Sequence, residues 1–110
     1  KVKEYLVSEG VKSAVIDLGG NVLCVGEKPD GKPFKIGIQK PFADRSETVS
    51  AVEIAGTSVV SSGICERYFE KDGKLYHHIL DPATGYPADS GLLSVSIVSA
   101  DGTMCDALST

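Results

Sequence analysis

Three features are missing from this 110-residue sequence, and each absence excludes a class of protein. No apolar run approaches the roughly 18 residues that a membrane-spanning helix needs. No block of like charge occurs and the net charge is −4, which argues against a nucleic-acid partner because phosphates favour a basic face. No two cysteines have the CxxC spacing, which argues against a structural zinc site.

The three cysteines also give no pattern for disulfide bonds. Cys24, Cys65 and Cys105 are far apart in the chain and have apolar neighbours. Because a free thiol behaves as a small apolar side chain, these positions favour core packing over redox chemistry. We therefore predict three free thiols.

The overall composition is that of an ordinary globular protein. With 42% hydrophobic and 24% charged residues, disorder of the whole chain is not expected. A chain of this length fits one domain, and we expect residues 1–110 to form it. The first residue is Lys1 rather than Met, and both ends read as the middle of a helix, so we expect an internal fragment of a longer protein.

Periodicity predicts an α+β fold, with an antiparallel or mixed β-sheet and a helix at each end. Residues 1–9 have helical spacing, and Gly10 is placed to stop that helix. Alternation of apolar and polar residues predicts strands at 13–18, 21–26, 34–39, 47–54, 58–61, 67–70, 74–78 and 93–99.

The turns predict how some of these strands connect. Glycine-containing turns indicate two hairpins, one joining 47–54 to 58–61 and one joining 67–70 to 74–78. Residues 81–91 are rich in Pro, Gly, Thr and Asp and read as a loop. The pattern Thr103-x-x-Asp106 resembles a capping box that opens the second helix.

Two short segments are suited to approach by a ligand. Asp17 is followed by Gly19 and Gly20, and paired glycines let a backbone come close to a ligand; the alternative is a bulge or tight turn. This is not a dinucleotide fingerprint, because GxGxxG is absent. Ser62 and Gly63 follow another serine and offer donors to a phosphate, with a bulged strand end as the alternative.

A histidine pair before a proline-stiffened loop is the most specific segment. If residues 74–78 form a strand, His77 and His78 point to opposite faces, so only one can face a given site. Such a loop on a rigid strand can hold an acid or base in place. The alternative is that both histidines lie on the surface and Asp81 only caps the turn.

Asp106 and Thr110 are four residues apart, so a helix would present both on one face. A carboxylate and a hydroxyl are hard oxygen donors, and Mg²⁺ prefers few protein oxygens, which leaves positions for water and phosphate. The alternative is that Asp106 is only the acidic member of the capping box.

These segments occur together in an order that resembles the ApbE family, the FAD:protein FMN transferases once called thiamine-biosynthesis lipoproteins. The matching strings are AVIDLGGNV at 14–22, SSG at 61–63 with ER at 66–67, HILDP at 78–82 with TG at 84–85, and DALST at 106–110. The resemblance covers essentially the whole chain and implies a T-fold-like α+β core, truncated at both ends.

The resemblance implies a function and a set of roles. The family binds Mg²⁺ at the pyrophosphate of FAD, transfers FMN to a threonine of an acceptor protein and releases AMP. His78 would be the catalytic histidine, and Asp106 and Thr110 would be metal ligands. The residues expected near FAD are Asp17, Gly19, Gly20, Ser62 and Gly63. A histidine can accept a hydroxyl proton near neutral pH, which suits this chemistry.

The resemblance also implies a setting and leaves alternatives open. The acceptor would be a redox-pump or flavin-carrier subunit, and the protein would be exported and lipid-anchored.

Family segments before Lys1 and beyond Thr110 have no counterpart here, so poor FAD binding and low activity are expected of these residues alone. The alternatives are an FAD pyrophosphatase, a flavin-binding module without turnover and a general α+β interaction domain; the last leaves the motif order unexplained.

Overall fold

The chain begins with a short helix that ends where the sequence predicts. The computed structural model describes residues 1–110, and helix α1 spans Val2–Ser8. At its end the Gly10 N–H donates to the Val7 carbonyl at 3.0 Å and the Val11 N–H donates to the Leu6 carbonyl at 2.9 Å. This pair of hydrogen bonds is the Schellman motif, which satisfies carbonyls that the helix leaves free.

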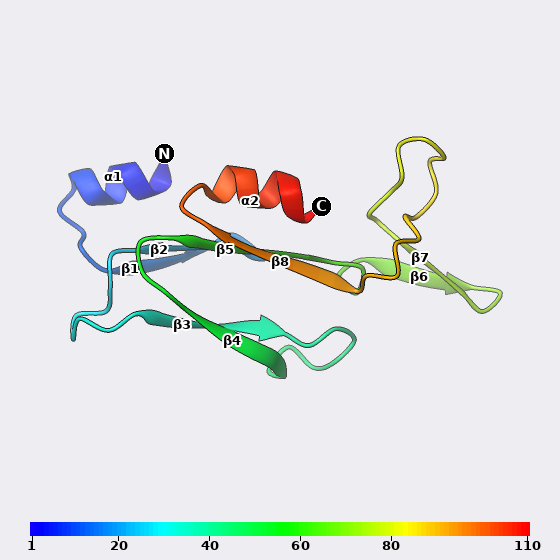
Figure 1. Ribbon diagram of the computed structural model, residues 1–110, viewed down its shortest axis with the longest axis horizontal. Helices are drawn as coiled ribbons and strands as arrows, with labels where there is room; N and C mark the ends of the chain where they lie inside the picture. The colour runs from blue at the N-terminus through cyan, green and yellow to red at the C-terminus, as the bar shows by residue number, and fades with distance from the viewer.

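The main sheet has four antiparallel strands in the order β1-β2-β5-β8 (Figure 1). The strands are β1 (Ala14–Asp17), β2 (Asn21–Val25), β5 (Ser58–Gly63) and β8 (Ser94–Ser99). The predicted α+β fold with antiparallel pairing is confirmed. Strand β5 runs on through Ser62 and Gly63, which pair regularly with β8, so the bulged strand end considered for this segment is wrong.

One predicted hairpin is wrong. Strand β4 (Thr48–Ile54) pairs with β3 (Phe34–Gln39) in a separate two-stranded sheet, and not with β5. The turn at 55–57 instead carries the chain from one sheet to the other. It is fixed there because the Gly56 N–H donates to the Gly26 carbonyl and the Cys24 N–H donates to the Thr57 carbonyl, each at 2.9 Å.

The main sheet lies between the two remaining layers (Figure 1). On one face Cys24 and Val59 pack with Ile54 of the β3-β4 sheet, and partly buried apolar side chains of that sheet surround them. On the other face lies helix α2 (Gly102–Ser109), which buries Cys105 and Ser109. Successive side chains of β5 point to opposite faces of the sheet, so this strand packs against both layers.

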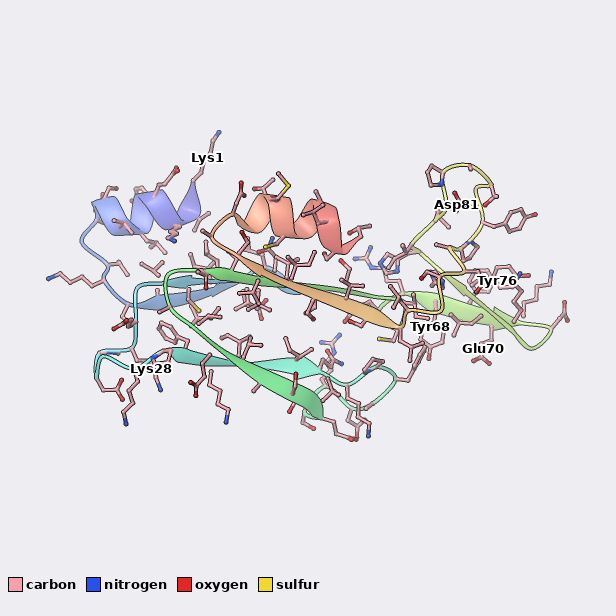
Figure 2. The ribbon with its side chains drawn as sticks, in the orientation of Figure 1. Lys1, Lys28, Tyr68, Glu70, Tyr76 and Asp81 are labelled. Carbon is pink, nitrogen blue, oxygen red and sulfur yellow. The ribbon has the colours of Figure 1, made fainter.

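The second predicted hairpin is confirmed. Strands β6 (Tyr68–Lys71) and β7 (Lys74–His77) pair around a two-residue turn, in which Asp72 has φ 51° and Gly73 has φ 71°. Two positive φ values define the turn type that best matches strand twist, and Asp-Gly favours it. The hairpin projects from one end of the main sheet, as Figures 1 and 2 show, and leads directly to residue 78.

The predicted capping box is wrong, because helix α2 begins two residues earlier. Its N-cap is Asp101, whose carboxylate accepts hydrogen bonds from the Thr103 N–H at 3.0 Å and the Met104 N–H at 3.2 Å. The helix starts close to the sheet, since a Cβ on Gly102 would lie 2.9 Å from the Ser58 Oγ. Asp106 therefore lies inside the helix and takes no part in its cap.

The three cysteines are free thiols, as predicted. Cys24 and Cys105 are fully buried, one on each face of the main sheet, and Cys65 is half-buried.

Neither helix has the length and apolar character that crossing a membrane would require.

Candidate active site

One cavity of about 680 Å³ gathers every residue that the sequence analysis assigned to a site. It opens where the β1-β2 turn, the end of β5, the start of the loop after β7 and the end of α2 come together. The predicted site residues that line it are Asp17, Gly19, Gly20, Ser62, Gly63, His78, Asp106 and Thr110. Residues from opposite ends of the sequence thus share one space, which we call the main cavity.

The β1-β2 turn brings backbone to the edge of the main cavity. The Asp17 carboxylate accepts a hydrogen bond from the Gly19 N–H at 2.9 Å, and the Ser61 N–H donates to the Gly20 carbonyl at 2.9 Å. Gly20 has φ 93°, and a Cβ there would lie 3.2 Å from the Ser61 carbonyl oxygen. Only glycine allows this close approach. The turn is therefore tight, and it also presents main chain to a ligand.

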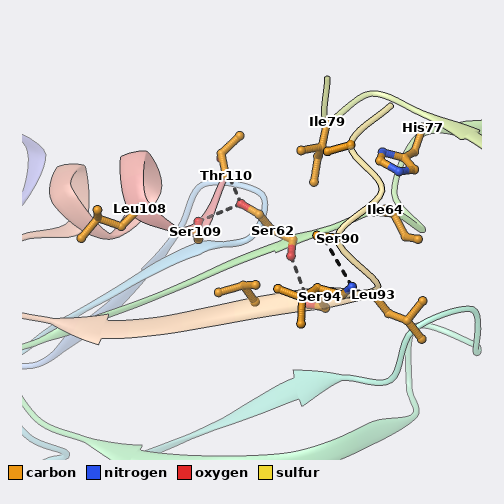
Figure 3. A pocket seen from close by; sticks show the side chains of 13 residues that line it. Ser62, Ile64, His77, Ile79, Ser90, Leu93, Ser94, Leu108, Ser109 and Thr110 are labelled. Atoms are coloured by element: carbon orange, nitrogen blue, oxygen red, sulfur yellow. Dashed lines mark hydrogen bonds between the residues drawn. The ribbon is translucent and has the colours of Figure 1, made fainter. Parts of the chain in front are cut away.

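The two histidines line different cavities. His78 lies in the main cavity, whereas His77 lines a second cavity of about 280 Å³ with Ile64 and Ile79 (Figure 3). The His77 Nδ1 is buried there without a hydrogen-bond partner. The expected divergence of the two side chains is therefore observed.

The His78 ring is held by main chain. Its Nδ1 lies 3.2 Å from the Arg67 carbonyl oxygen, which also accepts the His78 backbone N–H at 3.2 Å. A carbonyl oxygen can only accept, so Nδ1 carries the proton of the neutral ring and Nε2 keeps a lone pair. This arrangement leaves Nε2 able to act as a base.

The loop after His78 is stiffened by Asp81. Its carboxylate accepts the Ala83 N–H at 2.9 Å, and its carbonyl accepts the Thr84 and Gly85 N–H groups at 3.2 and 2.8 Å. Asp81 thus caps this turn, as the alternative reading of the segment held. A rigid turn directly after His78 restricts the position of that side chain.

At the other side of the main cavity, α2 presents Asp106 and Thr110. The Thr110 hydroxyl donates to the Asp106 carbonyl at 3.2 Å, and its oxygen lies 3.3 Å from the Ser62 Oγ. Because Asp101 caps the helix, the competing explanation of Asp106 as a capping residue is removed. Its carboxylate is exposed and lines the cavity.

The donor chemistry of this pair fits Mg²⁺. An ionised carboxylate and a neutral hydroxyl are hard oxygen ligands on one helix face, and Mg²⁺ is usually bound by one or two carboxylates together with water and phosphate. No group of three or more His, Cys, Asp or Glu residues is placed to hold a metal ion. A magnesium site completed by substrate oxygens needs no such group.

Sequence reasoning missed two arginines. Arg45 and Arg67 line the main cavity, and neither takes part in the two ion pairs of the structure. A guanidinium group recognises phosphate through paired hydrogen bonds. Arg67 belongs to the family string ER at 66–67, but the resemblance implies no role for it. Arg45 has no sequence signal, because its loop reaches the cavity only when β3 and β4 pair.

Comparison with known proteins gives one consistent result. The FAD:protein FMN transferase of Klebsiella pneumoniae (strain 342) is 50% identical over 101 residues, which are 92% of this chain and 30% of that protein. The FAD:protein FMN transferase of Treponema pallidum (strain Nichols) is 38% identical over 118 residues, with 100% of this chain and 33% of that protein covered.

Solved structures agree with these relatives. The ApbE protein of Thermotoga maritima superposes with a TM-score of 0.87 at 38% identity, over 97% of this chain and 34% of that one. The apo form of the flavinyl transferase ApbE from Pseudomonas stutzeri gives a TM-score of 0.76 at 36% identity, over 98% and 33%. The chain thus spans about a third of the length of the relatives it matches. Since the ApbE family model matches residues 1–110, the whole of the sequence, this chain belongs to the ApbE family.

Proposed function

We propose that the full-length protein containing this chain transfers FMN from FAD to a threonine hydroxyl of an acceptor protein, with Mg²⁺ as cofactor and AMP as the second product. The observation that supports it most is the main cavity, in which His78, Asp106, Thr110 and the β1-β2 turn meet. Its relatives carry the name FAD:protein FMN transferase, which agrees with this chemistry.

The lining of the main cavity suits a dinucleotide. Its volume of about 680 Å³ falls within the range of small-molecule sites, roughly 300–1,000 Å³. Arg45 and Arg67 supply positive charge for a pyrophosphate, and the glycines of the β1-β2 turn let phosphate oxygens approach main chain. In this arrangement the pyrophosphate lies between the turn and the end of α2.

Asp106 and Thr110 would hold Mg²⁺ through their side-chain oxygens. When bound, the ion neutralises negative charge on the pyrophosphate, which is what phosphoryl-type transfer requires. The Asp106 carboxylate is free for this purpose because Asp101, and not Asp106, caps the helix.

His78 would act as the general base. Its Nε2 accepts the proton of the acceptor threonine while the hydroxyl oxygen attacks the phosphorus on the FMN side of the pyrophosphate. The bond from that phosphorus to the bridging oxygen breaks, and AMP leaves with the bonding electrons. The Nδ1–H bond to the Arg67 carbonyl oxygen keeps the ring in the required tautomer during this step.

The decisive experiment incubates the full-length protein with FAD, Mg²⁺ and an acceptor that carries a threonine, followed by mass spectrometry and quantification of AMP. We expect a covalent FMN adduct on the acceptor and an equal amount of AMP. The matched control replaces the acceptor threonine by valine, which keeps its shape and removes the nucleophile. FMN and AMP released without an adduct would identify an FAD pyrophosphatase instead.

We also propose that the full-length protein is exported and lipid-anchored, and that its acceptor is a redox-pump or flavin-carrier subunit. Both proposals rest on the family to which the chain belongs. Cell fractionation with a protease-accessibility assay tests the first, and recovery of the full-length protein in the soluble cytoplasmic fraction would contradict it.

A further inference from the structure

Ser62 is connected to the end of α2 by a cluster of hydroxyl groups (Figure 3). Its Oγ lies 2.8 Å from the Ser109 Oγ and 3.3 Å from the Thr110 Oγ1. Its main-chain carbonyl accepts a hydrogen bond from the Ser94 hydroxyl at 3.2 Å. Ser109 is only 5% exposed, so the cluster lies at the buried junction of β5 and α2.

The protons of these hydroxyls can be assigned by counting. A hydroxyl donates once and accepts twice. The Thr110 hydroxyl can donate to the Asp106 carbonyl, 3.2 Å away. The Ser109 hydroxyl has two acceptors in reach, the same carbonyl at 3.3 Å and the Ser62 Oγ at 2.8 Å, and the shorter contact assigns its proton to Ser62. The Ser62 proton is then free for the Thr110 Oγ1. In this chain of bonds every proton is used once, and Thr110 keeps one lone pair for a ligand.

We infer that Ser62 is a positioning residue for the magnesium site rather than a direct flavin contact. By donating to Thr110 it fixes the rotation of that hydroxyl, so that the free lone pair points into the main cavity beside the Asp106 carboxylate. This inference rests on the proposed function, because it assumes that Thr110 and Asp106 bind Mg²⁺. Groups that orient metal ligands typically account for about 10–100-fold in metal affinity.

A purely structural role of Ser62 predicts a different result. If Ser62 only ties α2 to the sheet, removing either partner of the 2.8 Å bond should have the same effect. If Ser62 orients Thr110, removal of Ser62 should weaken Mg²⁺ binding much more than removal of Ser109. Ser61 and Ser96 form another hydroxyl pair at 2.7 Å, which joins strands β5 and β8. Ser96 lines neither cavity and provides a matched control.

The test is titration of Mg²⁺ into the full-length protein saturated with FAD by calorimetry, with thermal melts of each variant to verify folding. Ser62→Ala should raise the Mg²⁺ dissociation constant about 10-fold, whereas Ser109→Ala and Ser96→Ala should leave it close to wild type. Ser62→Thr keeps the hydroxyl and should restore binding. Asp106→Asn removes a ligand and serves as the positive control.

The outcomes separate this inference from the proposed function. Wild-type affinity in Ser62→Ala, with Asp106→Asn impaired, would overturn the role of Ser62 and leave the metal site standing. Equal losses in Ser62→Ala and Ser109→Ala would show that the bond only joins helix and sheet, and would also overturn it. Absence of Mg²⁺ binding by the FAD-saturated wild-type protein would contradict the metal site and this inference together.

Discussion

His77 and His78 are neighbours in the chain, but the structure gives them different surroundings. His78 lines the main cavity with its Nδ1 held by the Arg67 carbonyl oxygen, whereas the Nδ1 of His77 is buried in the second cavity without a partner. Strand β7 ends at His77, one residue short of the predicted strand, but the His78 N–H still donates to the Arg67 carbonyl at 3.2 Å. The extended pairing therefore continues to His78, and successive side chains of an extended chain point to opposite faces. Only His78 is therefore positioned to act on a ligand of the main cavity.

We predict that His78→Ala in the full-length protein lowers the rate of FMN transfer by about 10²–10⁴-fold, the usual cost of losing a general base. Folding should be unaffected, because the His78 side chain is exposed. The rate is measured as adduct formed per unit time, and circular dichroism verifies the fold. His77→Ala is the matched control, and a severe His77→Ala beside a mild His78→Ala would show that the assignment is reversed.

Burial also sets the behaviour of one thiol. Desolvation raises the pKa of Cys24 above 9.0, and the nearby positive charge of Lys3 opposes this shift to a smaller extent. The folded chain therefore holds this proton more tightly than the unfolded chain does. The resulting contribution to stability is complete below the ordinary thiol pKa and is lost as the pH rises through the raised value.

We predict that the free energy of unfolding falls more steeply above pH 9.0 in the wild-type protein than in Cys24→Ala. Urea denaturation at a series of pH values measures the two slopes, and only the slopes are compared, because the substitution also leaves a cavity. Equal slopes in wild type and Cys24→Ala would contradict the raised pKa.

Among the elements, helix α2 carries two aspartates, one at its N-cap and one that we propose as a metal ligand. Asp101 satisfies N–H groups at the start of the helix, and Asp106 lies one turn further on with its carboxylate in the main cavity. A cap stabilises a helix, whereas a ligand binds an ion. The two roles can therefore be separated by the quantities that each substitution changes.

We predict that Asp101→Ala lowers the free energy of unfolding by about 0.5–2 kcal/mol, as is typical for a lost N-cap, and leaves the Mg²⁺ requirement of transfer unchanged. Asp106→Asn should have the opposite profile, with near-normal stability and a sharply higher Mg²⁺ requirement. Denaturation and Mg²⁺-dependent transfer assays of the full-length protein measure the two quantities. A large loss of stability in Asp106→Asn with an unchanged Mg²⁺ requirement would return Asp106 to a structural role.

The whole molecule is flat and open. It measures 53 × 28 × 17 Å with a radius of gyration of 16.1 Å, whereas a compact domain of this length would have about 13 Å. Only 9 of 110 residues are buried, and large apolar side chains such as Tyr5, Phe69 and Leu108 are more than half exposed. The core that residues 1–110 form is therefore thin.

We predict that residues 1–110, prepared alone, bind the dye ANS and unfold at a low urea concentration, because little apolar surface is removed from water. The same residues within the full-length protein should be more resistant, which hydrogen exchange of Val59 and Val60 in strand β5 can measure. A cooperative transition at high urea without ANS binding would contradict this prediction.

Much of the local structure follows from the sequence because it depends on neighbouring residues. Gly10 ends α1, Asp72-Gly73 makes the β6-β7 turn, and alternation separates the two histidines; each depends on backbone geometry within a few residues. The order of the motifs also identified the family that the comparisons support. Local rules misplaced the start of α2 at Thr103, since both Asp101 and Thr103 are residues that can cap a helix.

Long-range packing decided what the local rules left open. The sequence predicts that strand β4 pairs with β5, but it pairs with β3, because this lets Ile54 cover Cys24 and Val59 on the main sheet. The same packing carries the loop of Arg45 to the main cavity, and the docking of α2 brings Thr110 to Ser62. Burial of apolar surface between layers depends on residues far apart in the chain, so only the folded structure could reveal these contacts.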